Sequence, residues 1–146
     1  MIDIEIGRAK RGRRAYSFDD IAMVPSRRTR DPEEVSVAWQ INAYSFTATI
    51  LSSAMDSVVS PATAVELGRL GGLGVLDLEG LWTRYEDPKP YLDEIAQLPE
   101  SDVVRRMREI YSEPIKEELI GARIKQIRDA GVVTAGALSP QRTAQY

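Results

Sequence analysis

Two short polar segments hold the side chains with which this chain could do chemistry. Residues 50–54 are apolar or small, and Met55 and Asp56 follow them directly. Ser53 and Met55 are two residues apart, so on an extended backbone their side chains point to the same side. A serine hydroxyl can bond a phosphate or ribose oxygen, and a thioether can lie against the face of a purine. The pair therefore predicts a ligand contact at the end of a strand.

The same residues also have a purely structural interpretation. Asp56 could cap a turn and Met55 could fill the core, and residue type and spacing alone favour these roles. The second polar segment, at Asp77 and Glu79, leaves two alternatives open. These carboxylates could accept hydrogen bonds from a ribose or act as acid and base, or they could cap a short helix near residues 81–85.

The composition excludes several kinds of chemistry. The chain has 146 residues, a formal net charge of -3, no cysteine and no histidine. Disulfides, thiolate metal sites, a cysteine nucleophile and a histidine base are therefore excluded for this chain. Carboxylates, Lys, Tyr and Ser remain as candidates.

The elements that must position these groups alternate between strand and helix. Short, apolar, nearly uncharged runs are typical of strands buried on both faces of a parallel sheet. The pattern predicts a parallel α/β chain with right-handed crossovers, either an open sheet or part of a (β/α)₈ barrel, which needs about 250 residues. The predicted strands span residues 47–54, 73–76 and 132–137, and the predicted helices span residues 61–70, 101–107 and 115–127. Ser101 is expected to cap the second of these helices, and Gly131 is expected to end the third in the left-handed conformation. A last helix is expected to begin at Ser139.

Residues 7–30 are predicted to be loop-like and basic. No aromatic interleaving or groove-reading helix accompanies the charges, so a solvated or packing arm is favoured over a nucleic-acid patch. Alternation over residues 35–46 predicts a hairpin or an edge strand. The glycines of residues 68–74 precede a strand, which favours tight packing over a phosphate loop. The basic residues are Arg8, Lys10, Arg11, Arg13, Arg14, Arg27, Arg28 and Arg30.

No apolar run reaches the length of a signal peptide or of a membrane span. We expect a cytoplasmic protein that does not enter a membrane.

Three ordered segments resemble the IMP dehydrogenase/GMP reductase family. They are Tyr16–Ser26, with its Phe-Asp-Asp and Val-Pro pairs, Ile50–Val58, with its Ser-Ala-Met-Asp-Ser run, and Gly71–Leu76. The resemblance implies a (β/α)₈ TIM barrel that binds a purine mononucleotide (IMP, XMP or GMP), usually as a tetramer. It implies that Ser53 and Met55 contact the nucleotide, and Asp56 and Asp77 are weaker candidates.

The family's chemistry uses a cysteine on a later loop and NAD or NADP. Because this chain has no cysteine, we expect the N-terminal fragment of an IMP dehydrogenase-related oxidoreductase, with no catalytic residue and no cofactor bound by this chain alone. The expected layout is an arm and hairpin over residues 1–46 and about three strands of the barrel over residues 47–146. Its open edge predicts aggregation or partial order.

The segment Asp77–Leu81 departs from the histidine and asparagine that IMP dehydrogenases carry there. With Arg84–Pro88 it is similar to a related branch without CBS modules, and residues 101–130 are too short to hold such a pair. NAD-dependent oxidation of IMP to XMP is the expected activity of the whole protein. GMP reduction, or a non-catalytic role in nucleotide binding or oligomerisation, is the alternative.

Overall fold

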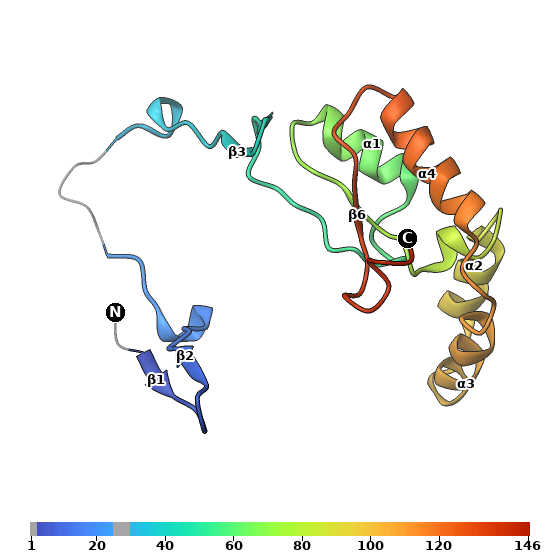
Figure 1. The fold of residues 1–146 in the computed structure, drawn as a ribbon. Helices are drawn as coiled ribbons and strands as arrows, with labels where there is room; N and C mark the ends of the chain where they lie inside the picture. Colours follow the sequence, from blue (N-terminus) through green and yellow to red (C-terminus); the bar gives the residue numbers. More distant parts are fainter. Residues whose placement is uncertain (1–2, 25–29) are drawn as a thin grey trace. The chain divides into compact units, whose positions relative to one another are not determined.

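The computed structural model describes residues 3–24 and 30–146, which fall into two compact units (Figure 1). The first unit is Met1–Ser36 and the second is Val37–Tyr146. The division comes ten residues earlier than the one expected from the sequence after residue 46, because the hairpin over residues 39–46 belongs to the second unit.

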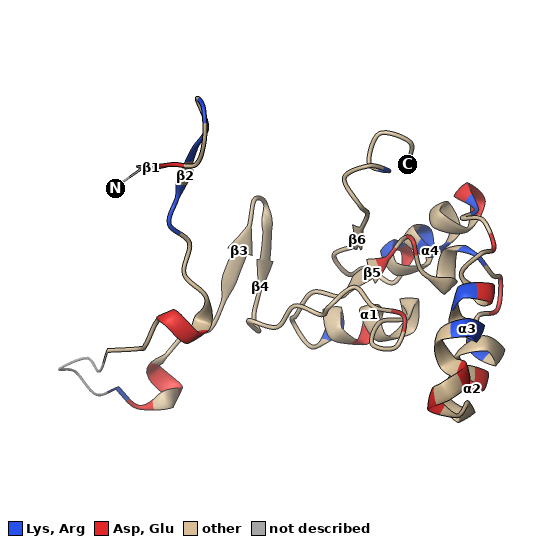
Figure 2. Cartoon of the chain, turned by 90° about the horizontal axis from the view of Figure 1, so that it is seen from below, with Lys and Arg blue, Asp and Glu red and all other residues tan. Residues whose placement is uncertain are grey.

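The first unit has no buried residue within 4–24 and 30–36. Strands β1 (Asp3–Glu5) and β2 (Arg11–Arg13) pair antiparallel, and two short 3₁₀ helices follow, η1 (Phe18–Asp20) and η2 (Pro32–Glu34). Most of the described basic residues of this unit lie in or next to β2, whereas both 3₁₀ helices are acidic (Figure 2). Arg27 and Arg28 of the predicted basic arm, and Pro25 and Ser26 of the family-like segment, lie outside the described residues.

The predicted hairpin is confirmed at the start of the second unit. Strands β3 (Trp39–Ile41) and β4 (Tyr44–Phe46) pair antiparallel around Asn42, whose φ is 50°. The rings of Trp39 and Phe46 stack with their centroids 4.6 Å apart. The Trp39 indole also donates to the carbonyl of Ala48 at 2.6 Å, which fixes the hairpin against the segment that follows.

Three parallel segments lie side by side in chain order. Leu51 bridges to Leu73, and Ser52 N–H donates to the Leu73 carbonyl at 3.0 Å. Strand β5 (Val75–Asp77) then pairs with β6 (Ala135–Ala137). The predicted parallel α/β arrangement is confirmed over these segments, and the described residues form no closed barrel.

Burial of the first segment on both faces was a wrong prediction. Ile50 and Leu51 are 56% and 57% exposed. Adjacent side chains of an extended segment point to opposite sides, so neither side of this segment is fully covered by the described residues of the second unit.

The predicted helices at residues 61–70 and 115–127 are confirmed as α1 (Pro61–Arg69) and α4 (Glu117–Asp129). Ser60 caps α1 by accepting from Thr63 N–H at 3.0 Å. Between them lie η3 (Leu81–Thr83), α2 (Lys89–Gln97) and α3 (Glu100–Ile110).

Two local predictions about these elements were wrong. Ser101 does not cap α3, which begins one residue earlier, after Pro99. Residues 140–145 form turns instead of a helix, since so short a segment gains little from its own hydrogen bonds without packing. Gly131 does have the predicted left-handed conformation, with φ at 77°.

The core lies between the parallel segments and the helices α1 and α4. It contains Val59, Ala64, Val65, Leu76, Leu78 and Ile127. Close packing explains the glycines: a Cβ at Gly74 would lie 2.4 Å from Ala64 Cα, and one at Gly68 would lie 2.7 Å from Val132 Cβ. The packing role predicted for residues 68–74 is confirmed.

Among the residues that the structure describes, no helix has both the length and the apolar character needed to cross a membrane.

Candidate functional site

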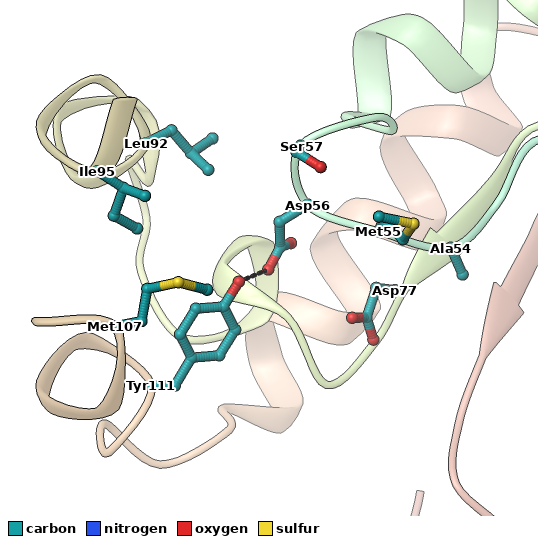
Figure 3. Close-up of a pocket in the computed structure, with 9 residues that line it drawn as sticks. All are labelled: Ala54, Met55, Asp56, Ser57, Asp77, Leu92, Ile95, Met107 and Tyr111. Atoms are coloured by element: carbon teal, nitrogen blue, oxygen red, sulfur yellow. Dashed lines mark hydrogen bonds between the residues drawn. The ribbon is translucent and has the colours of Figure 1, made fainter. Parts of the chain in front are cut away.

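A cavity of about 280 Å³ opens where the first two parallel segments end (Figure 3). The loop that carries Ala54, Met55, Asp56 and Ser57 forms one wall, and Asp77 at the end of β5 forms a second. Carboxyl ends of parallel strands are where ligands bind in α/β folds, because the loops converge there. The cavity therefore coincides with the position predicted for chemistry.

Met55 presents its side chain to this cavity from a tight turn. The N–H groups of Val58 and Val59 donate to the Met55 carbonyl at 2.9 and 2.8 Å, which fixes the turn. The Met55 residue is 51% exposed, so it does not fill a core here. Ser53, its predicted companion, is also exposed but lies outside the cavity lining.

Asp56 has a structural role as a hydrogen-bond acceptor for two other segments. Its Oδ2 accepts from Leu81 N–H at 2.8 Å and from the Tyr111 hydroxyl at 2.6 Å (Figure 3). Its Oδ1 is buried and has no partner among the described residues. A Cβ at Gly80 would lie 2.2 Å from this Oδ1, so glycine allows the carboxylate to sit over η3. Asp56 thus caps η3, and the turn-capping interpretation of this residue is confirmed.

Asp77 and Glu79 diverge from one another. Asp77 lines the cavity, and its Oδ1 accepts from Glu79 N–H at 2.9 Å. Burial raises the pKa of Asp77, and the nearby charge of Asp56 raises it further. Glu79 turns away and accepts from Ser139, whose hydrogen bonds lower the pKa of the Glu79 carboxyl. Since Asp56 caps η3, the capping role considered for Asp77 and Glu79 was wrong there.

The third wall is helical, and although a helix was predicted at residues 101–107, its place in the cavity lining was not. Leu92 and Ile95 project from α2, and Met107 and Tyr111 from α3 and the residue after it. Their spacings of three and four residues place each pair on one helix face, which is the signal that could have revealed them.

The two helices of this wall are tied to one another and to the segment that follows η3. Arg106 on α3 binds both carboxylate oxygens of Glu94 on α2, at 2.5 and 3.0 Å. The Tyr85 hydroxyl donates to the carbonyl of Ile110 at 2.8 Å, which holds the end of α3. The wall is therefore part of the second unit's fold, although α2 itself contains no buried residue.

The lining decides which ligand chemistry fits. Apolar groups from Met55, Leu92, Ile95 and Met107 face two carboxylates, and no Lys or Arg is among the described lining residues. A flat, uncharged ring with N–H donors suits such a cavity, because it gains apolar contact and can donate to Asp77. A phosphate would meet only negative charge. The described residues also hold no cluster of three or more potential metal ligands.

Comparison with known proteins gives a consistent picture. Residues 15–86 match the family described as the IMP dehydrogenase/GMP reductase domain. An uncharacterized oxidoreductase of Mycolicibacterium smegmatis is 42% identical over 143 residues, which are 94% of this chain and 38% of that protein. An uncharacterized oxidoreductase of Mycobacterium tuberculosis has the same identity and coverage.

Named enzymes and a solved structure also match. The inosine-5'-monophosphate dehydrogenase of Methanocaldococcus jannaschii is 38% identical over 64 residues, 44% of this chain and 13% of that enzyme. An IMP dehydrogenase/GMP reductase-like protein from Corynebacterium glutamicum superposes with a TM-score of 0.81 at 36% identity, over 98% of this chain and 40% of the other. This likeness supports a fold related to the TIM barrel. The chain spans about two fifths of the length of its mycobacterial relatives.

Proposed function

Because the chain belongs to the IMP dehydrogenase/GMP reductase family, we propose that it forms the base-binding side of a purine-nucleotide site in an oxidoreductase. The observation that carries this proposal is the half-exposed Met55 side chain, which lines the same largely apolar cavity as Asp77. A thioether can lie on the purine face while a carboxylate accepts from an N–H of the ring.

The proposal also concerns the longer protein to which this chain would belong. The three parallel segments would be the first strands of a (β/α)₈ barrel that continues beyond them, and the chain would be an N-terminal part of a longer enzyme. The expected activity of that enzyme is oxidation of IMP to XMP with NAD, in an oligomer in the cytoplasm. GMP reduction with NADP is the alternative direction.

The chain's own residues do not fit the nicotinamide cofactor of the family. The chain has no cysteine to attack the purine, and the described cavity lining has no cation to hold a pyrophosphate. The same lack of cations means that the nucleotide's phosphate would be held by another part of the longer protein.

Titration calorimetry of the chain with IMP, GMP and their nucleosides inosine and guanosine tests this proposal. We expect saturable binding in which each nucleoside binds at least as tightly as its nucleotide, because the phosphate gains nothing beside Asp77. Absence of binding by all four compounds would remove the proposed function of this chain. A nucleotide that binds much more tightly than its nucleoside would place the phosphate site in this chain and contradict the orientation.

Substitution of Met55→Ala localises the ligand. We expect affinity to fall severalfold while the free energy of unfolding changes by less than about 2 kcal/mol, since the side chain is half exposed. Met23→Ala is the matched control, because Met23 is 97% exposed and lies outside the cavity. Equal effects of both substitutions on binding would show that the ligand does not bind in this cavity.

A further inference from the structure

A single carboxylate joins three segments that are far apart in the sequence. Asp56 lies in the turn after the first parallel segment, Leu81 begins η3, and Tyr111 follows α3. The Leu81 N–H and the Tyr111 hydroxyl both donate to the same oxygen of Asp56, at 2.8 and 2.6 Å. Of these two donors, only the Tyr111 hydroxyl comes from the helical wall of the cavity.

The Asp56 carboxylate has little freedom in this arrangement. Its Oδ1 is buried against Gly80, where even one extra carbon would collide with it. Burial raises the pKa of the Tyr111 hydroxyl, and its hydrogen bond to Asp56 raises it further, so this donor stays protonated across the neutral range. A bond between a partly buried donor and a carboxylate is among the stronger hydrogen bonds of a protein.

The turn that Asp56 belongs to also carries Met55. Movement of Asp56 would therefore move the thioether that faces the cavity, and α3 would lose its attachment to that turn (Figure 3). No other side-chain hydrogen bond described by the structure joins the Met55–Ser57 turn to α2 or α3.

We propose that Tyr111 is a positioning residue of the cavity, which fixes the Met55–Ser57 turn through Asp56 and holds α2 and α3 over the site, so that ring binding and helix docking stabilise each other. The ligand part of this statement rests on the proposed function, whereas the link between Tyr111 and the turn does not. Ring binding and docking of α2 and α3 both stabilise the same position of the Met55–Ser57 turn, so each must favour the other.

Hydrogen exchange of the ligand-free chain tests the link by itself. The amides of Val58 and Val59 report the turn, because both donate to the Met55 carbonyl. Tyr111→Phe should raise their exchange rates about tenfold or more, since a hydrogen bond to a charged group is worth roughly 1.5–3 kcal/mol. Tyr85→Phe is the matched control: it removes a tyrosine hydroxyl that also binds the end of α3 but does not touch Asp56. Equal rates in the two variants, or no change in Tyr111→Phe, would overturn the proposal.

If Tyr111→Phe lacks a cooperative melt and is therefore not folded, a second variant tests the link. Asp56→Asn keeps an oxygen that can accept from both donors but removes the charge, so it should raise the same two rates by a smaller factor. Unchanged rates in folded Asp56→Asn would then overturn the link.

The ligand part is tested by titrating the same variants with inosine and guanosine. Tyr111→Phe should weaken binding severalfold and abolish the protection that ligand adds to the amides of α2 and α3, whereas Tyr85→Phe should retain both. Wild-type affinity in Tyr111→Phe would overturn the coupling. If the wild-type chain binds neither these nucleosides nor their nucleotides, the proposed function fails, and the ligand-free exchange rates still decide whether Tyr111 fixes the turn.

Discussion

Two regions of the second unit differ in how far their apolar side chains are buried. On the covered side, around β5, α1 and α4, Val59, Leu76 and Ile127 are at most 2% exposed. On the open side, at the first parallel segment, Ile50 and Leu51 are 56% and 57% exposed. The described residues of this unit therefore cover β5 far more completely than the first segment, and the candidate site lies where these two segments end.

The largest expected effect is loss of stability from the covered side. Leu76→Ala should lower the free energy of unfolding by about 2–5 kcal/mol, because it leaves a cavity in a fully buried position. Leu51→Ala should cost far less at its exposed position. Denaturant unfolding of both variants measures the difference, and equal losses would show that the open side is covered in solution.

The next effect concerns the boundary between the two sides. Gly80→Ala should destabilise the chain by about 1–3 kcal/mol, because the new Cβ displaces Asp56. Its φ of -85° is ordinary, so the cost is purely steric. Gly121→Ala in α4 is the control: apart from its chain neighbours and its own helix backbone, no atom lies within 4 Å of the new Cβ, and alanine in a helix should stabilise by up to about 1 kcal/mol. Thermal unfolding that ranks the two variants otherwise would contradict the geometry.

A smaller effect depends on pH. The raised pKa of Asp77 means that the fold disfavours its charged form, so this group destabilises the chain above that pKa. The penalty is relieved as the pH falls through the raised pKa and is gone below the ordinary value of 3.8. Asp77→Asn should therefore be more stable than the wild type at neutral pH, and the advantage should vanish in acid. Glu79 affects stability in the opposite direction, since its lowered pKa contributes stability that is lost in acid. Because Glu79 is present in both the wild type and Asp77→Asn, this contribution does not change the difference between them. An advantage that grows on acidification would contradict the sign for Asp77.

The smallest effect on stability is expected on the open side. Ile50→Ser should change the free energy of unfolding by about 0.5 kcal/mol or less, yet it should reduce self-association, because it removes an exposed apolar side chain beside others. Sedimentation velocity of the two chains at several concentrations measures this. Unchanged association would mean that these side chains do not mediate contacts between copies.

The elements that the sequence predicted well are those with local signals. Ser60 and Pro61 predict the start of α1, and Gly131 takes the left-handed conformation that ends α4. The position of the cavity at the ends of the strands followed from the general behaviour of parallel sheets. Met55 and Asp77 were singled out from that rule, and the structure brings both into one cavity lining.

The parts that were missed depend on contacts between distant residues. The bond from Tyr111 to Asp56 joins positions 55 residues apart, and no local pattern encodes it. Burial of residues 47–54 on both faces was predicted from their composition, but composition does not say which neighbours this chain contains. The turns at residues 140–145 show the same limit, because a capping signal alone does not sustain a helix without packing.

The order of the parallel segments has a consequence for synthesis on the ribosome. Leu51 pairs with Leu73, whereas Val75 pairs with Ala135, so each pairing joins a segment to one made later. The first segment, α1 and β5 can therefore assemble while residues after Asp77 are still being added, since the pairing of nearby segments closes a short loop. The third strand then adds to an edge that already exists, and folding can follow the direction of translation.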